Sequence, residues 1–175
     1  MQRYGVDVRL AAVEDAAFIL SLRTHEKLAR FIHATENDLA KQEAWMRAYK
    51  ERERAGREYY FIYSSAGVPY GTNRIYDIQP RSATCGSWIC RPGISPELPI
   101  ISTMILRDIM FSLLGFEYIV FDVRKQNKSV QRMHKMLGAV QTAESELDYF
   151  YRLTAEDYWA RKGKILKLMG IDMPA

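Results

Sequence analysis

The chain has 175 residues, of which 48% are hydrophobic and 26% are charged, values that fit one folded domain and exclude a disordered or fibrous chain. Its net charge of +4 suits an anionic small-molecule ligand but is too small and too dispersed for a nucleic-acid-binding surface. There are only two cysteines, no apolar signal segment, and no apolar stretch near the roughly 20 residues that a membrane helix needs. We therefore expect a cytoplasmic protein that does not cross a membrane.

The N-terminal third predicts one strand followed by three helices. Residues 6–10 alternate apolar and polar side chains, which is the pattern of a half-buried strand. Glu14 and Asp15 then precede an apolar-periodic run, and acidic side chains favour the N-terminus of a helix. A second, short helix over 25–32 and a third over about 38–55 complete this part.

Three strands are predicted next, over residues 58–64, 70–78 and 83–91. Their short connections favour an antiparallel meander. Cys85 and Cys90 fall on the third of these strands at an odd separation, so a regular strand places them on opposite faces. We therefore expect that the two cysteines neither pair with each other nor bind one metal ion.

The C-terminal half alternates helices with strands. A long helix, a strand, a second helix, two strands and a tail helix are expected over 98–114, 118–124, 127–137, 140–143, 147–153 and about 154–166. The tail helix begins with a capping-box sequence. Strands that alternate with covering helices predict an α+β fold, a mixed α/β sandwich, in a single domain spanning residues 1–175.

The segment after the 118–124 strand carries a family resemblance. Residues 127–139 read NKSVQRMHKMLGA. This resembles the Asn-x-x-Ser/Ala-x-x-Leu/Phe-Tyr-x-Lys-x-Gly-Phe signature of the GNAT acyl-CoA N-acyltransferase superfamily, whose order of elements nearly the whole chain shares. In residues 59–62 and 147–150, the chain is also similar to members that acetylate nucleotide-linked amino sugars in surface-polysaccharide pathways.

The resemblance implies a GNAT-like α/β/α sandwich around a central, mostly antiparallel, splayed sheet. It also implies acetyl-CoA as co-substrate and no metal. In that family two strands diverge, and the pantetheine arm of the coenzyme pairs with the opened strand edge. Here the diverging segments correspond to residues 87–91 and 121–124, with an amide near Ile89 positioned to stabilise the thioester oxygen. The implied coenzyme-binding residues are Trp88, Ile89, Cys90, Ser102, Thr103 and Asn127.

The chain departs from the family pattern at one residue and in one loop. His134 stands where many members have the tyrosine that protonates the leaving thiolate, and a histidine titrates near neutral pH, so we expect His134 to be the general acid. The alternative is that His134 only packs against its neighbours. The family's glycine-rich phosphate loop corresponds to residues 91–103, where Pro96 and Pro99 lack amide donors. The sequence of this loop leaves open whether phosphate binding is intact, weakened or lost.

Arg74 and Tyr76 alternate on one face of the second meander strand, which in the resembled family looks into the acceptor cleft. We expect both to contact the acceptor, with ordinary packing on a sheet as the alternative. Glu36 and Asp38, in the loop between the early helices, are candidates for the general base.

The resulting hypothesis is an acetyl-CoA-dependent N-acetyltransferase that moves an acyl group directly to a primary amine. The expected acceptor is an amino sugar on a nucleotide carrier. Two alternatives stay open: a protein N-terminal acetyltransferase of the ribosomal-protein type, and a catalytically silent GNAT-fold binding module. The expected partner is a small-molecule amine, not a nucleic acid or a membrane, and a homodimer is left open.

Overall fold

The strands join one sheet in the order β1-β2-β3-β4-β5-β6-β8-β7, in a computed structural model that describes residues 1–171. Residues 172–175 of the expected domain lie outside this described range. Only β5 and β6 run parallel, and every other neighbouring pair of described strands is antiparallel. The mixed, mostly antiparallel sheet confirms the predicted fold class. The strand bounds are Gln2–Arg3 (β1), Val6–Leu10 (β2), Tyr59–Ser65 (β3), Val68–Tyr76 (β4), Ser82–Cys90 (β5), Tyr118–Arg124 (β6), Val140–Glu144 (β7) and Asp148–Thr154 (β8).

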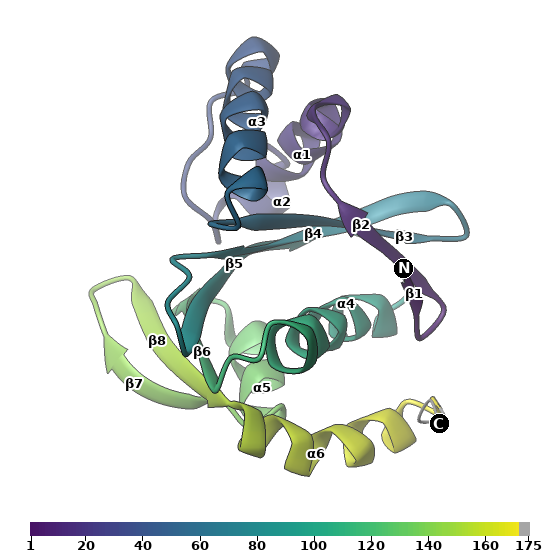
Figure 1. Cartoon of the computed structure of the whole chain (residues 1–175), viewed down its shortest axis with the longest axis vertical. Helices are drawn as coiled ribbons and strands as arrows, with labels where there is room; N and C mark the ends of the chain where they lie inside the picture. Colours follow the sequence, from purple (N-terminus) through teal and green to yellow (C-terminus); the bar gives the residue numbers. More distant parts are fainter. Residues whose placement is uncertain (172–175) are drawn as a thin grey trace.

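Helices cover both faces of the sheet, with α1–α3 on one face and α4–α6 on the other (Figure 1). Their bounds are Ala16–Arg23 (α1), Glu26–Ala29 (α2), Leu39–Arg54 (α3), Glu97–Asp108 (α4), Lys128–Met136 (α5) and Ala155–Leu168 (α6). The sequence predicts one regular helix over 98–114, whereas the structure ends α4 at Asp108 and continues it as a π-helical turn over Ile109–Leu113. Among residues 1–171, no helix combines the length and the apolar character that crossing a membrane requires.

Two apolar clusters hold these helices to the sheet. The larger cluster lies under α4 and the smaller one under α1 and α3. β3 contributes to both, because alternate side chains of a strand point to opposite faces. Tyr60 and Ile62 join the smaller cluster, whereas Phe61 and Tyr63 join the larger one. β3 is therefore a central strand that is buried on both faces.

The sheet opens between β5 and β6. These strands pair only from Ser82↔Tyr118 to Thr84↔Val120, after which residues 85–90 and 121–124 diverge. This divergence confirms the splayed sheet predicted from the sequence. It leaves backbone groups of both strands without the partners that a continuous sheet would supply.

A β-bulge lies in the part of β5 that borders this opening. Thr72 of β4 pairs with Ile89 and Arg74 pairs with Gly86, so one residue of β4, Asn73, opposes two residues of β5, Ser87 and Trp88. Inserting one residue reverses the alternation of side chains beyond the bulge. Cys85 and Cys90 consequently contact the same apolar cluster, and the expectation that they lie on opposite faces is wrong.

One buried carboxylate joins α4 to distant parts of the chain. Asp108 is fully buried and accepts hydrogen bonds from Tyr158 Oη (2.7 Å), Lys162 Nζ (2.8 Å) and Tyr4 Oη (2.8 Å). Arg3 Nε lies 3.1 Å from its Oδ2. Asp108 therefore ties both the β1–β2 hairpin and α6 to the helix that borders the opening of the sheet.

Replacing this carboxylate is expected to destabilise the fold strongly. Asp108→Ala leaves Lys162 buried without its counter-charge, which costs about 3–5 kcal/mol of unfolding free energy. Urea denaturation measures the loss. Arg47→Gln, which removes an exposed ion pair with Glu43, is the matched control and should cost about 0.5 kcal/mol or less. A loss below about 1 kcal/mol for Asp108→Ala would contradict the structural role of this cluster.

Candidate active site

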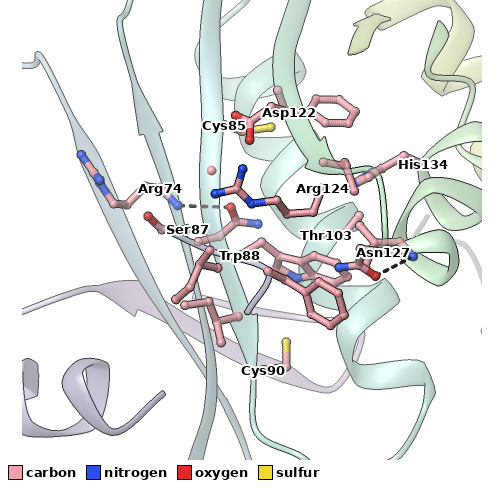
Figure 2. A pocket seen from close by; sticks show the side chains of 18 of the residues that line it. Arg74, Cys85, Ser87, Trp88, Cys90, Thr103, Asp122, Arg124, Asn127 and His134 are labelled. Carbon is pink, nitrogen blue, oxygen red and sulfur yellow. Dashed lines mark hydrogen bonds between the residues drawn. The ribbon is translucent and has the colours of Figure 1, made fainter. Parts of the chain in front are cut away.

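A cavity of about 470 Å³ occupies the opening between β5 and β6. Its lining comes from both faces of the sheet. Arg23 and Leu28 contribute from α1 and α2 on one face, whereas Thr103 and His134 contribute from α4 and α5 on the other. The cavity therefore connects the two faces at the point where the strands separate. Figure 2 shows Arg74 and His134 on opposite sides of it, with Trp88 between them.

Eight of the nine residues predicted as site residues line this cavity: Arg74, Tyr76, Trp88, Ile89, Cys90, Thr103, Asn127 and His134. The ninth, Ser102, does not. It is fully buried, its hydroxyl donates to the Pro99 carbonyl oxygen (2.9 Å), and it accepts from Trp88 Nε1 (3.3 Å). Ser102 thus supports the wall of the cavity from behind, which position along the chain alone does not reveal.

The two acidic residues considered as bases do not line the cavity either. Asp38 Oδ1 accepts from the Lys41 amide (3.0 Å) and so caps α3. Glu36 forms an exposed ion pair with the side chain of Lys41. Asp122 of β6 is instead the carboxylate that lines the cavity.

His134 is held by a buried arginine. Arg107 Nη2 donates to His134 Nδ1 over 2.9 Å, and the two residues are only 1% and 6% exposed. The His134 ring lies 4.4 Å from the Phe121 ring, centroid to centroid. Burial, together with the positive charge of Arg107, lowers the pKa of His134 well below its ordinary value of 6.5.

This environment changes the expected chemistry of His134. An imidazole whose pKa lies well below 6.5 is uncharged at neutral pH, so His134 does not titrate there as the sequence suggests. Because arginine can only donate, Nδ1 must be the acceptor, and the single ring proton resides on Nε2. His134 therefore offers a neutral N–H donor rather than a charged acid.

Positive charge dominates the lining of the cavity, which contains four arginines (Arg23, Arg74, Arg107 and Arg124) and Asp122. Arg74 pairs with Glu58 (2.6 Å) and Arg124 with Asp148 (2.8 Å). Within residues 1–171, neither Arg23 nor Arg107 has a carboxylate partner. A cavity with this lining attracts anions and repels cations.

Sequence reasoning missed Arg23, Arg107 and Asp122. Arg107 carries a signal that was available, because it interrupts the apolar run of a helix and a buried arginine needs a specific partner. Arg23 and Asp122 carry no comparable signal. Charged residues at the end of a helix or on the polar side of a strand are ordinary surface positions.

The residues present fit the thiol and pantetheine part of an acyl coenzyme. Backbone groups along residues 85–90 face no partner strand on the β6 side. Thr103 Oγ1 is buried without a hydrogen-bond partner and its side chain lines the cavity. Asn127 Oδ1 caps α5 by accepting from the Val130 amide (3.4 Å), as Figure 2 shows, which leaves its NH₂ group for a ligand.

The start of α4 is a weaker match for the pyrophosphate. Its first turn contains Glu97, whose carboxylate contacts Ser95, and Pro99, which has no amide hydrogen. The Leu98 amide donates to the Ser95 carbonyl oxygen (3.1 Å). This helix terminus therefore offers few free amide donors. No group of three or more metal-ligating side chains occurs within residues 1–171.

Comparison with known proteins identifies the same architecture. A family model described as an acetyltransferase (GNAT) domain matches residues 6–140. Among solved structures, apo FdhC, described as a nucleotide-linked sugar GNAT, has a TM-score of 0.85 and 33% sequence identity, covering 94% of this chain and 95% of that chain. No curated protein matches the chain in a sequence search.

More distant structures are similar in fold alone. The ribosomal-protein-S5-alanine acetyltransferase from Vibrio fischeri has a TM-score of 0.77 at 15% identity, covering 90% of this chain and 97% of that chain. The spermidine N-acetyltransferase from Vibrio cholerae, solved in complex with CoA and spermine, has a TM-score of 0.76 at 16% identity, covering 90% and 99%.

The two cysteines are expected to be unreactive in the folded protein. Burial raises the pKa of Cys85 to about 11 and that of Cys90 to about 12. A thiol pKa raised by two units leaves about a hundredfold less thiolate at pH 8, so alkylation by iodoacetamide should slow by at least that factor. Mass spectrometry of the native protein measures the rate, with the urea-unfolded chain as control. Equal rates in the two states would contradict this assignment.

Proposed function

The chain belongs to the GNAT family of acetyl-CoA-dependent N-acetyltransferases, and on this premise we propose that its acceptor is a primary amine on an anionic small molecule, namely a nucleotide-linked amino sugar. The observation that carries the proposal is the arginine-rich cavity that connects the two faces of the splayed sheet. The similarity to FdhC, at 33% identity over nearly the whole of both chains, supports the same acceptor class.

The donor side of the proposed site is formed by β5, α4 and α5. Bound acetyl-CoA supplies an activated acyl group that an amine attacks directly, with release of the thiol. The unpaired backbone along residues 85–90 binds the pantetheine arm as an added strand would. Thr103 and Asn127 donate hydrogen bonds to its polar groups. A backbone amide near Ile89, on the open edge of β5, stabilises the carbonyl oxygen as it gains negative charge.

His134 acts in this proposal as a hydrogen-bond donor to the leaving sulfur. Arg107 fixes the proton on Nε2, and burial together with the charge of Arg107 keeps the ring uncharged by lowering its pKa. The positive charge beside Nδ1 also polarises the ring, so that Nε2–H becomes a stronger donor towards developing negative charge. This replaces the tyrosine of the family signature by a neutral donor of a different kind.

The acceptor side is formed by α1, α2 and β4. Arg23 and Arg74 attract the anionic carrier, and Tyr76 borders the same region of the cavity. Burial raises the pKa of Tyr76 to about 12, and the nearby charge of Asp122 adds to this rise, so its hydroxyl stays protonated. Asp122 is the group positioned to receive a proton from the acceptor amine.

Neither a polyamine acceptor nor the protein N-terminal acceptor that the sequence left open gains specific support. A cationic cavity disfavours polyamines, which carry several positive charges at neutral pH. The likeness to the ribosomal-protein acetyltransferase is one of fold at 15% identity.

A panel of acceptors tests the proposal. Release of free thiol from acetyl-CoA is measured with nucleotide-linked amino sugars, with free amino sugars, with spermidine and with a peptide bearing a free N-terminus. We expect the highest kcat/KM for a nucleotide-linked amino sugar. Turnover of spermidine or of the peptide alone would overturn the proposal.

Removing the histidine is expected to slow turnover without weakening coenzyme binding. His134→Ala should lower kcat by about a hundredfold, the lower end of the range for one positioned hydrogen-bond donor to developing negative charge, while the KM for acetyl-CoA changes little. His25→Ala is the matched control, because His25 is exposed and only caps α2.

The pH profile separates a neutral donor from a charged acid. Because the pKa of His134 is lowered, its protonation belongs well below pH 6.5, so the wild-type rate should show no limb from this group between pH 6.5 and 8. A rate that falls as the pH rises through that interval, and that loses this dependence in His134→Ala, would show that the imidazolium is the working form. An unchanged kcat would remove His134 from the reaction altogether.

A further inference from the structure

We propose that a second, smaller cavity beside the main one binds the pyrimidine base of the acceptor, and that Arg23 and Arg74 hold its diphosphate where the two cavities meet. This inference rests on the proposed function, because it assigns a place to one part of the same acceptor. The expected ligand is a uracil or thymine nucleoside diphosphate.

The second cavity has a volume of about 210 Å³ and is continuous with the main one in its lining. Arg23, Arg74 and Ser87 line both. The remaining walls come from the loop after α2, from α3 and from β3, and consist of Ala34, Thr35, Gln42, Trp45 and Tyr60. Its volume is less than half that of the main cavity.

The junction between the cavities carries uncompensated positive charge. Arg23 Nε donates to Thr35 Oγ1 (2.8 Å) and its Nη2 to the His33 carbonyl oxygen (3.4 Å), with no carboxylate partner among residues 1–171. Arg74 pairs with Glu58, but Glu58 is shared with Arg52 at 2.6 Å. Two guanidinium groups beside a shared opening suit a diphosphate, whose oxygens accept paired N–H donors.

An unpartnered hydroxyl points to a polar ligand in the smaller cavity. Tyr60 is 1% exposed, lines this cavity, and its Oη makes no hydrogen bond of normal geometry within residues 1–171, although the side chains of Thr72 and Arg23 lie close to it. Burial raises the pKa of Tyr60, against the opposing charges of Arg23 and Arg74, so the hydroxyl remains a donor. Buried polar groups without a partner are rare, and a bound ligand explains this one.

Gln42 supplies the complementary group. Its side chain is 9% exposed, lines the same cavity, and makes no hydrogen bond within residues 1–171. A carboxamide both donates and accepts, and a tyrosine hydroxyl donates. Uracil and thymine present two carbonyl acceptors on either side of one N–H donor. Tyr60 and Gln42 together therefore match a pyrimidine of this type.

The positions of the two cavities agree with the direction of the reaction. Arg74 lies across the main cavity from His134 (Figure 2). A base in the smaller cavity and a diphosphate at Arg23 and Arg74 place the attached sugar in the main cavity. The sugar amine then faces β5, where the acyl group is expected.

The inference is tested by calorimetric titration of the whole protein with uridine diphosphate in the presence of saturating CoA. We expect saturable binding that CoA does not displace. Arg23→Gln should weaken it by at least tenfold, since it removes charge-assisted hydrogen bonds, and Tyr60→Phe by about fivefold. Arg47→Gln, on an exposed face of α3, removes the same charge and should leave binding unchanged.

Tyr60→Phe separates binding from stability. The substitution deletes a hydroxyl that makes no hydrogen bond of normal geometry within residues 1–171, so the midpoint of thermal unfolding without nucleotide should not fall. Unchanged nucleotide affinity in this variant would overturn the role of Tyr60 and with it the assignment of the cavity. Loss of nucleotide binding on addition of CoA would place the nucleotide in the coenzyme site and overturn the inference.

Failure of the inference is distinguishable from failure of the proposed function. Acetylation of amino sugars without any binding of uridine diphosphate would overturn the inference and leave the acetyltransferase proposal intact. Binding of uridine diphosphate with the expected variant effects, but without acetylation of any amino sugar, would support the cavity assignment and overturn the proposed acceptor. Adenosine diphosphate binding as tightly as uridine diphosphate would contradict the choice of a single-ring base.

Discussion

The separation of β5 from β6 is the constraint on which the rest of the structure depends. Pairing stops after Thr84 and Val120, and backbone groups that a continuous sheet would satisfy are left for another partner. The bulge in β5 lies at Ser87 and Trp88, within the separated part of the strand, and reverses the alternation of its side chains relative to β4. Together they produce a cavity that reaches both faces of the sheet, so that a donor and an acceptor can approach from opposite sides.

Buried charge organises the two halves of this cavity. On the side of α4 and α5, Arg107 has no carboxylate partner within residues 1–171 and donates to His134. Burial, together with the charge of Arg107, keeps the imidazole neutral, and the hydrogen bond directs its proton. On the side of α1 and β4, Arg23 and Arg74 keep a net positive potential. The same residue type thus has two roles: one guanidinium orients a side chain within the protein, and the others attract an anionic ligand.

Most of the fold follows from local patterns in the sequence. Alternation predicts β2, and apolar periodicity with capping residues predicts α3 and α5, where Asp38 and Asn127 do cap the helices. Such patterns do not predict the π-helical turn after α4 or the short strand β1. Local patterns also do not predict the face of the sheet on which Cys90 lies, because a β-bulge depends on how two strands pair.

The candidate site likewise contains residues that the sequence predicts and residues whose place depends on tertiary packing. Residues carried by the 127–139 signature or by strand alternation reach the cavity, whereas Ser102 is turned away by its bonds to Pro99 and Trp88. The ionisation of His134 depends on Arg107, 27 residues away in the chain, and no local pattern contains it. Arg23 and Tyr60 meet only after α1 and β3 have packed together.

Hydrogen–deuterium exchange with and without acetyl-CoA tests the central claim most directly, because it reports on the backbone amides of the opened strand. The account predicts that amides within residues 85–90 become protected when acetyl-CoA binds, while those of β3, already paired on both sides, do not change. Saturable binding of acetyl-CoA with no added protection in residues 85–90 would contradict it.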